Sequence, residues 1–334
     1  MGSLTPYLRS FDRFLRADGK SDRTRKIYRA RAAGLDAWLD QLPTPGRRGT
    51  PGTSEKLMAP HDPCEVTSRH IAAYVDAVAV RTSQATASNH YRALQQFFKY
   101  LALEEAISDD PFAELSPPKV IAKPATAIPY DALERLLTAC KGTDLGALRD
   151  TGIIMVLIDT GLRPGESAAL NHAANPLESD VDFDYNVLHA TDAHGRRRVV
   201  PFGLGTRRAL ERYLRHRDEF RQAVGLPIDG PLWIGALRKG GLTGSGIAQM
   251  LTRRCAQAGI ARINPYEFRH TFAHRRRADS DDERDLKRLL GLRTSQMLSR
   301  YRTTAAGEPV SAPRRTTSRC DRLVGELSRR STRR

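Results

Sequence analysis

The sequence has few cysteines and no long apolar run, and both shortages narrow the classes of protein to consider. Its four cysteines, Cys64, Cys140, Cys255 and Cys320, are far apart among 334 residues. They form no metal knuckle or redox pair, so we expect free thiols in a reducing cytosol and no metal site. The longest apolar run, Ile153–Ile158, is far shorter than the ~20 residues of a membrane-spanning helix. The N-terminus lacks the apolar core of a signal peptide, so we expect no membrane association.

Positive charge is what the chain has in excess. It carries 54 Lys and Arg against 38 Asp and Glu, a formal net charge of +16. This excess indicates a polyanionic partner, because each neutralised phosphate releases counterions and adds affinity. A surface kept soluble by arginine gives the same composition, so charge alone leaves both interpretations open. The length and the 40% of hydrophobic residues are enough for two domains with separate cores.

The apolar spacing within residues 1–115 predicts an all-helical domain. Apolar spacing predicts a helix with Thr5 as its N-cap, and further helices at about 23–39, 68–79 and 86–103. The segment 43–60 is rich in Pro, Gly, Ser and Thr, which is typical of a loop between helices. The second helix is expected to bury Ile27, Leu35, Trp38 and Leu39. The fourth has an apolar stripe formed by Ala87, Tyr91, Leu94, Phe98 and Leu101.

Polar faces of this domain are candidates for DNA contact. Asn89, Arg92 and Gln96 share the face of the fourth helix that lies away from its stripe. Such a face fits a major groove, although a solvated helix face has the same pattern. Arg25 and Lys26, on basic faces of the second helix, are further candidates.

A proline-rich segment, 116–127, separates this domain from a second one at 128–306. It is expected to be an extended linker, in which Lys119 and Lys123 follow a DNA backbone. The second domain is expected to have helices at 130–140, 148–159, 207–217, 245–258, 266–278, 283–290 and 295–301, and short strands at 186–189, 197–202 and 232–234. The fold class is therefore mostly α with a small β component, an α+β domain after an all-α domain.

The last segment, 307–334, is basic. From Arg314 onward it has eight arginines around one apolar cluster of Leu323, Val324 and Leu327. A disordered DNA-binding tail and a short helix that docks on a neighbouring subunit both fit this composition.

The first segment with candidate chemistry reads DTGLRPGESAAL, residues 159–170. A buried helix is expected to end at Gly161 and another to begin at Pro164, with Glu166 in its first turn. Arg163 then lies at the junction, where a guanidinium beside a helix N-terminus forms an anion site. An arginine that only bridges two helices fits the same pattern.

Two later segments complete a larger pattern. NPYEFRHTFA, residues 264–273, places Arg269 in a predicted helix, and LLGLRTSQMLSRY ends at Tyr301. Together with TGLRPGE, they resemble the tyrosine recombinase (phage integrase) family in content, order and spacing. The segment ASNHYRALQQFFKYLALEEAISDDPFAELSPPK is similar to the end of that family's core-binding domain and its linker. The resemblance extends from Leu4 to about Arg302.

The resemblance implies a site-specific DNA recombinase that acts through a 3′-phosphotyrosyl intermediate. Tyr301 matches the nucleophile, Arg163 and Arg269 match the two phosphate-clamping arginines, and Glu166 and His270 are supporting residues, His270 as a buried hydrogen-bonding group. The bond energy stays in the phosphotyrosyl link, so no cofactor is expected. The implied partners are double-stranded DNA, a homotetramer in the synaptic complex, and accessory DNA-bending or directionality factors. Such a protein acts at the nucleoid in the cytoplasm.

Three assisting positions depart from the family pattern. The lysine of the family's hairpin pattern, GKG-x-x-R-x-VP, falls on Ala193 in DAHGRRRVVP. The family's histidine three residues before the second arginine is Tyr266, and the His or Trp after LLG is Leu292. The general acid is therefore open. The candidates, in falling order of preference, are His194, Arg196 (also a DNA-contact candidate), Lys239 and Tyr266.

Two other functions stay open. A DNA-binding protein with weakened catalysis on a recombinase scaffold would account for the three departures. Retention of both arginines and the tyrosine argues against it. A relaxing topoisomerase would use the same chemistry, but the N-terminal half resembles the recombinase type.

Overall fold

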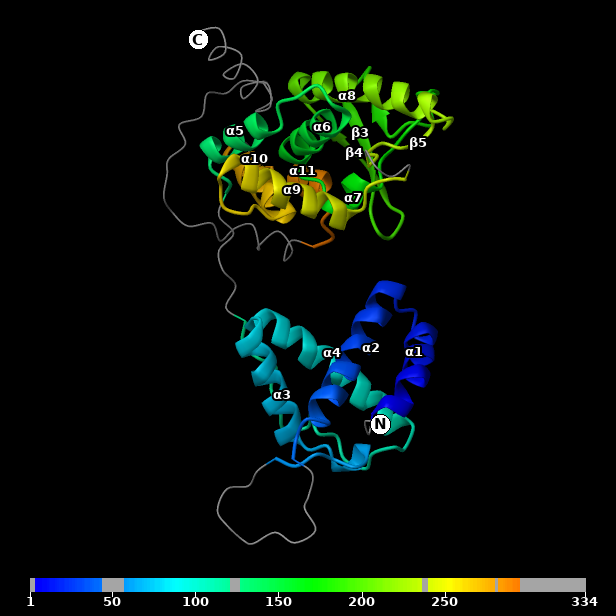
Figure 1. The fold of residues 1–334 in the computed structure, drawn as a ribbon, viewed down its shortest axis with the longest axis vertical. Helices are drawn as coiled ribbons and strands as arrows, with labels where there is room; N and C mark the ends of the chain where they lie inside the picture. The colour runs from blue at the N-terminus through cyan, green and yellow to red at the C-terminus, as the bar shows by residue number, and fades with distance from the viewer. Residues whose placement is uncertain (1–3, 44–56, 121–126, 236–239, 280–281, 295–334) are drawn as a thin grey trace. The chain divides into compact units, whose positions relative to one another are not determined.

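The computed structural model describes residues 4–43, 57–120, 127–235, 240–279 and 282–294, and the chain divides into two compact units, Met1–Ala122 and Lys123–Arg334 (Figure 1). In its described residues the first unit is all helical, and the second adds short antiparallel strands to helices, so the predicted fold class is confirmed. Several predictions lie outside the described residues: those for Lys123, Lys239, Tyr301, the helix 295–301, most of the 43–60 loop and the 307–334 tail.

The helical unit contains α1 (Leu8–Ala17), α2 (Asp22–Leu39), α3 (Ser68–Arg81) and α4 (Gln84–Leu103), with single 3-10 turns at Thr5–Tyr7 and Pro63–Glu65. Helix α4 packs against α2 and α3, and α1 packs against α2 (Figure 1). The predicted stripe of α4 is confirmed, since none of its five apolar residues is more than 4% exposed. Burial of this stripe contributes to the stability of the unit, because apolar area removed from water stabilises at about 25 cal/mol per Å².

Two expectations for this unit are wrong. Thr5 caps no helix: its hydroxyl donates to Asp36 at 2.5 Å, and the Leu4 amide donates to the same buried carboxylate at 2.9 Å. Ile27 is 36% exposed. The buried side of α2 runs through Ala32, Leu35 and Leu39, and one turn earlier that side is occupied by the neighbouring Tyr28, which packs on the core. Ile27 therefore faces solvent.

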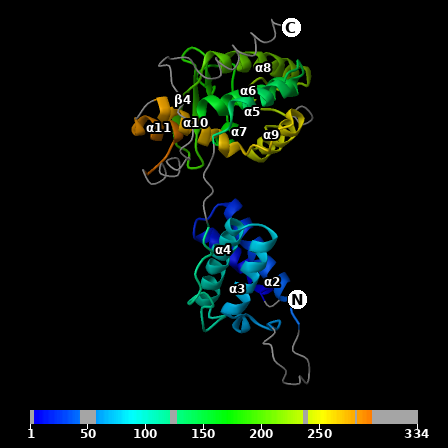
Figure 2. The same cartoon turned by 90° about the vertical axis from the view of Figure 1, so that its left-hand side faces the viewer.

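The second unit is built around α6. Its helices are α5 (Tyr130–Ala139), α6 (Leu145–Thr160), α7 (Pro164–Ala168), α8 (Leu204–Ala223), α9 (Gly244–Ala258), α10 (Pro265–Asp279) and α11 (Glu283–Leu290). Helix α6 is buried along most of its length, as its apolar sequence predicts, with α8 on one side and α9 and α10 on the other (Figures 1 and 2). Within the described residues, even the most apolar helices fall short of what crossing a membrane requires.

Two small sheets complete the unit. Strands β2 (Val181–Asp182), β3 (Val187–Thr191) and β4 (Arg197–Pro201) form one antiparallel sheet in that order. Strand β1 (Asn171–His172) pairs with β5 (Gly230–Pro231). Two-residue strands such as β1 and β2 are too short for an alternation pattern, so they were not predicted.

The strand predicted at 232–234 is wrong, although this segment is buried. The hydroxyl of Tyr213 donates to the Leu232 carbonyl at 2.9 Å and accepts from the Ile234 amide at 3.1 Å. A side chain thus takes two of the hydrogen bonds that a neighbouring strand would otherwise make, while the Leu232 amide still donates to the Leu170 carbonyl and the Trp233 carbonyl accepts from the Leu242 amide, both at 2.8 Å. Ile234 makes only an isolated bridge with Gly241.

Candidate active site

The junction between α6 and α7 places Arg163, as the sequence predicts. Gly161 ends α6 with φ of 59°. A Cβ atom at Gly161 would lie 2.7 Å from the ring of Phe272, so both the backbone conformation and the close contact require glycine. Pro164 then begins α7, and Arg163 is its N-cap residue in an extended conformation.

Glu166 fixes Arg163 at this junction. Its Oε2 accepts the Arg163 amide at 2.8 Å, and its Oε1 accepts from Arg163 Nη1 at 2.6 Å. The Arg163 side chain is 31% exposed, and within the described residues its other guanidinium nitrogens have no partner. Arg163 is therefore held on one side and open to an anion on the other. The role of Glu166 as a support for Arg163 agrees with this geometry.

Arg198 belongs to the same network and was not singled out from the sequence. Its Nη1 and Nη2 donate to the two oxygens of Glu166 at 3.0 and 2.8 Å, and its Nε donates to the Leu289 carbonyl at 2.8 Å. Burial alone would raise the pKa of Glu166, but the hydrogen bonds and charges of Arg198 and Arg163 outweigh it and hold that pKa below its ordinary value. The alternation of β4, which turns Arg198 inward between two exposed residues, is the signal that could have identified it.

Arg269 lies on α10 and is 2% exposed. Its Nη1 donates to the Gly161 carbonyl at 3.0 Å, and its Nη2 donates to the Leu290 carbonyl. One guanidinium therefore joins the C-terminal ends of α6 and α11. Arg163, Arg198 and Arg269 are connected through Glu166 and through consecutive carbonyls, Leu289 and Leu290, at the end of α11.

The β3–β4 turn carries the first two general-acid candidates. His194 is exposed, and within the described residues its ring has no partner. Arg196 is paired: its Nε donates to Asp192 at 2.8 Å, and this bond lowers the pKa of Asp192 well below its ordinary value. Asp192 also accepts the backbone amides of His194 and Arg196 at 2.8 and 3.1 Å, which fixes the turn.

The remaining assisting positions lie on α10 and after α11. Tyr266 is 53% exposed on the first turn of α10. His270 is half-buried rather than buried, and burial together with the charge of Arg269 lowers its pKa, so its ring is neutral near pH 7. Leu292 packs on an apolar cluster with Leu290 and has no proton to give.

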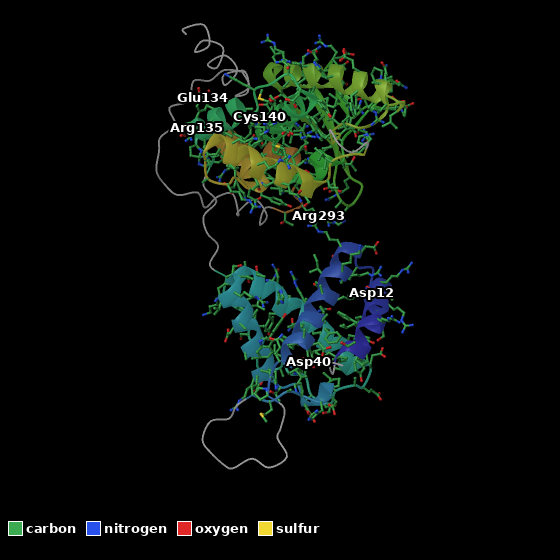
Figure 3. The ribbon with its side chains drawn as sticks, in the orientation of Figure 1. Asp12, Asp40, Glu134, Arg135, Cys140 and Arg293 are labelled. Carbon is green, nitrogen blue, oxygen red and sulfur yellow. The ribbon has the colours of Figure 1, made fainter. Side chains whose placement is uncertain are left out.

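The DNA-contact candidates of the helical unit differ in exposure and in whether their side chains already have partners. Asn89 and Arg92 are exposed on α4, whereas Gln96 is half-buried. Arg25 donates to Asp12 of α1, labelled in Figure 3, through two nitrogens at 3.1 and 2.6 Å, and its side chain is 18% exposed. Lys26 and Lys119 are exposed.

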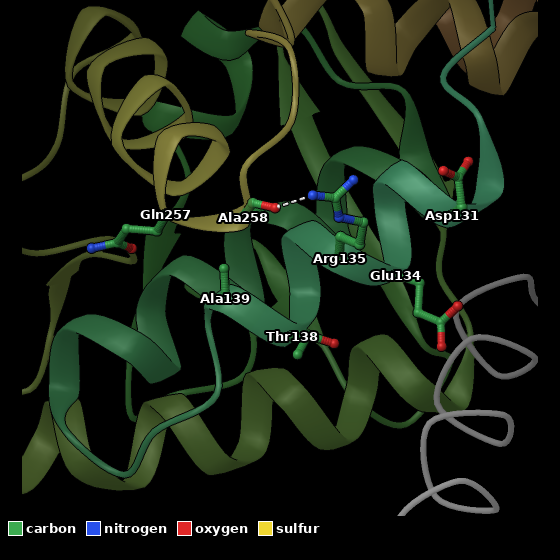
Figure 4. Close-up of a pocket in the computed structure, with 7 residues that line it drawn as sticks. All are labelled: Asp131, Glu134, Arg135, Thr138, Ala139, Gln257 and Ala258. Atoms are coloured by element: carbon green, nitrogen blue, oxygen red, sulfur yellow. Dashed lines mark hydrogen bonds between the residues drawn. The ribbon is translucent and has the colours of Figure 1, made fainter.

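A separate groove lies between α5 and the end of α9 and has a volume of about 510 Å³ (Figure 4). Arg135 crosses it and donates to the Ala258 carbonyl at 2.8 Å. None of the connected arginines lines it. In the part of the chain that the structure describes, no group of three or more His, Cys, Asp or Glu side chains is placed to hold a metal ion.

Comparison with known proteins extends the resemblance over both units. Residues 127–308 match the phage integrase family, and residues 7–107 match the phage integrase N-terminal SAM-like domain. Tyrosine recombinase XerC of Anoxybacillus flavithermus is 30% identical over 213 residues, 63% of this chain and 68% of the relative. XerC of Azotobacter vinelandii is 27% identical over 277 residues, 78% of this chain and 87% of the relative.

Solved structures share the fold. A lambda integrase dimer bound to a COC′ core site has a TM-score of 0.63 at 17% identity, covering 92% of this chain and 80% of that one. XerH recombinase bound to its difH substrate has a TM-score of 0.61 at 16% identity, covering 83% and 75%. The family matches and the relative that is 30% identical confirm the family predicted from the sequence motifs. The chain belongs to the phage integrase family and is a tyrosine-type site-specific recombinase.

Proposed function

We propose that this recombinase cleaves DNA with Tyr301 while Arg163 and Arg269 hold the scissile phosphate. The observation that carries the proposal is the state of Arg163: Glu166 fixes it, yet part of its guanidinium stays open to an anion. Such a group is pre-organised for a phosphate, because little side-chain freedom remains to be lost on binding. Arg269 adds a second fixed positive charge on the same network.

The proposed step is a direct exchange at phosphorus. The Tyr301 phenol gives up its proton and its oxygen bonds to the phosphorus. The bond from phosphorus to the 5′ oxygen breaks, and that leaving oxygen takes a proton from the general acid, for which His194 is the first candidate. The arginines neutralise charge that builds on the non-bridging oxygens. Attack by a free 5′ hydroxyl on the 3′-phosphotyrosyl bond then reverses the step with a new strand, which needs no external energy source.

The test is covalent trapping. A target duplex with a nick beside the cleavage site lets the short 5′-hydroxyl fragment diffuse away and leaves the protein attached. Wild-type protein should give an adduct that survives denaturation, with the DNA mapped by peptide mass to Tyr301. Absence of an adduct on a site that the protein binds would favour the DNA-binding scaffold with weakened catalysis. Leu292 cannot donate a proton, and for this reason the alternative with weakened catalysis needs to be tested.

Double-stranded DNA and further copies of this chain are the proposed partners. The solved relatives include a lambda integrase dimer on a core site and a lambda integrase tetramer on a Holliday junction. We extend this arrangement to the present chain as a homotetramer that holds two duplexes, with accessory DNA-bending or directionality factors as further partners. The net charge of +16 supports a DNA partner, because it suits contact with many phosphates.

Replacing Arg92 tests the exposed face of α4. Arg92→Ala should weaken DNA binding about tenfold, because one phosphate or base contact is lost. The slope of log K against the logarithm of the salt concentration should become shallower by about one. Arg25→Met is the matched control in the same unit. The nitrogens of Arg25 are already taken by Asp12 and Asp22, so its loss should leave affinity nearly unchanged. Fluorescence anisotropy over a salt series measures both. A larger loss for Arg25→Met would reverse the assignment.

Replacing His194 tests the general acid. His194→Ala should slow cleavage of ordinary DNA about a hundredfold, near the lower end for general acids, because water can partly substitute on an exposed turn. A substrate with sulfur in the 5′ bridging position needs no proton for its leaving group, so the variant should cleave it at the wild-type rate. Equal slowing on both substrates would remove His194 from this role and leave Tyr266 or Lys239.

A further inference from the structure

We propose that Arg198 is a positioning residue that keeps the phosphate-binding Arg163 and the end of α11, which precedes Tyr301, in one fixed arrangement. The inference rests on the proposed roles of Arg163 and Tyr301 and adds a residue to that site. Arg198 acts through Glu166 and a backbone carbonyl rather than on the DNA.

The first support is that Arg198 is a charge placed on the inner face of a sheet. Its side chain is 9% exposed, whereas Arg197 beside it is 62% exposed. It lies opposite Ala190 in the β3–β4 register, and the small alanine leaves room for it. A charge at such a place is costly unless it is fully hydrogen-bonded, so its partners are structurally determined rather than incidental.

The second support is the set of donors around Glu166. Each carboxylate oxygen accepts one hydrogen bond from Arg163 and one from Arg198, at distances from 2.6 to 3.0 Å. A carboxylate held by a bidentate guanidinium has little freedom to rotate. The orientation of Arg163 therefore depends on Arg198, although the two arginines share no direct hydrogen bond.

The third support is the contact with α11. Arg198 Nε donates to the Leu289 carbonyl, the position just before the carbonyl that Arg269 holds. Gly291 ends the helix with φ of 61°, and a Cβ there would lie 3.1 Å from Arg198 Nη1 and 3.2 Å from its Cζ. The backbone after α11 thus lies directly against this guanidinium. Tyr301 follows Gly291 by ten residues, so α11 determines where the segment carrying it begins.

The test compares Arg198→Lys with Arg197→Lys. Lysine keeps the charge but cannot bond both oxygens of Glu166 and the carbonyl together. Arg198→Lys should lower the cleavage rate at saturating DNA about a hundredfold, a loss that a 1 Å misplacement of a reacting group can cause. The DNA dissociation constant should stay within about twofold of wild type. Arg197→Lys, the same change on the outer face, should leave both nearly unchanged. A loss for Arg198→Lys no larger than that for Arg197→Lys would overturn the inference.

Further variants separate positioning from simple loss of stability. Val200→Ala removes core volume from the same strand face without touching Glu166, and it should keep the cleavage rate at a temperature where both proteins are folded. When Glu166→Gln and Arg198→Lys are combined, their losses in cleavage rate should not multiply, because both substitutions break the same connection between Glu166 and Arg198. Multiplied losses would contradict the inference. The Glu166→Gln/Arg198→Gln pair removes one negative and one positive charge together, and the amide oxygen at position 166 can still accept a bond from Arg163. This pair should show the same loss if Arg198→Lys does not fold.

A second measurement does not depend on cleavage. Amide hydrogen exchange in peptides covering Arg163 and Gly291 should be at least about tenfold faster in Arg198→Lys than in Arg197→Lys, because the Glu166 acceptor and the end of α11 are released together. Unchanged exchange in both peptides would overturn the inference. Failure of the proposed function has a different signature, since the wild-type adduct would then map to a residue other than Tyr301 or be absent.

Discussion

Replacing Tyr301 with phenylalanine is expected to abolish the covalent DNA complex and to leave DNA affinity within about threefold of wild type. The variant loses one hydroxyl among many contacts to the DNA backbone, which carry most of the binding energy. Chemistry, in contrast, has no substitute for the attacking oxygen. An ordinary phenol has a pKa of about 10, so the proposed attack also depends on the positive field of Arg163 and Arg269 or on a proton acceptor.

The measurement is trapping on nicked duplex over hours, resolved under denaturing conditions, with affinity measured separately by anisotropy. Tyr185→Phe is a matched control, since Tyr185 is 80% exposed at the β2–β3 turn, outside the arginine network. It should give adduct at the wild-type rate. An adduct formed by Tyr301→Phe, or peptide mass that places the DNA on another side chain, would contradict the assignment of Tyr301.

The elements that the sequence predicts well are those with a long repeating pattern. The stripe of α4 and the buried helix α6 each have many apolar positions, so one misjudged position does not change the prediction of a helix. Arg163 was found because glycine, proline and glutamate around it each have a fixed role at a helix junction. Gly161 and Glu166 take those roles in the structure.

Arg198 has no such neighbouring residues to identify it as part of the site. Arg198 is the last of three consecutive arginines, two of which lie in β4, and the alternation with buried Val200 indicates only that it turns inward. Its partners, Glu166 and the Leu289 carbonyl, lie far away in the sequence. The strand predicted at 232–234 failed for a related reason, because Tyr213, nineteen residues before Leu232, supplies two of the hydrogen bonds that a strand would have supplied. Both depend on contacts between segments distant in the sequence, which local patterns do not contain.

Replacing the two arginines that we propose to bind the phosphate is expected to have different effects. Arg163→Ala should lower the cleavage rate by about 10³ to 10⁵-fold, the range for an arginine that stabilises transferring phosphoryl groups. It should hardly change the melting temperature, because its side chain is 31% exposed and Arg198 still pairs with Glu166. Arg163→Lys should recover part of the rate, since a point charge remains but bidentate bonding is lost.

Arg269→Lys, in contrast, should lower both the rate and the melting temperature. Its guanidinium holds the carbonyls of Gly161 and Leu290 at a site that is 2% exposed, and lysine cannot reach both, so a buried acceptor is left unpaired at a cost of about 1–3 kcal/mol. Single-turnover cleavage and thermal unfolding, measured on the same preparations, distinguish the two patterns. Arg208→Ala, an exposed arginine on α8 across α6 from α10, is the control and should change neither quantity. If Arg163→Ala cleaves at the wild-type rate, the open guanidinium of Arg163 does not bind the scissile phosphate. If Arg269→Lys loses stability but cleaves normally when folded, Arg269 only joins two helix ends.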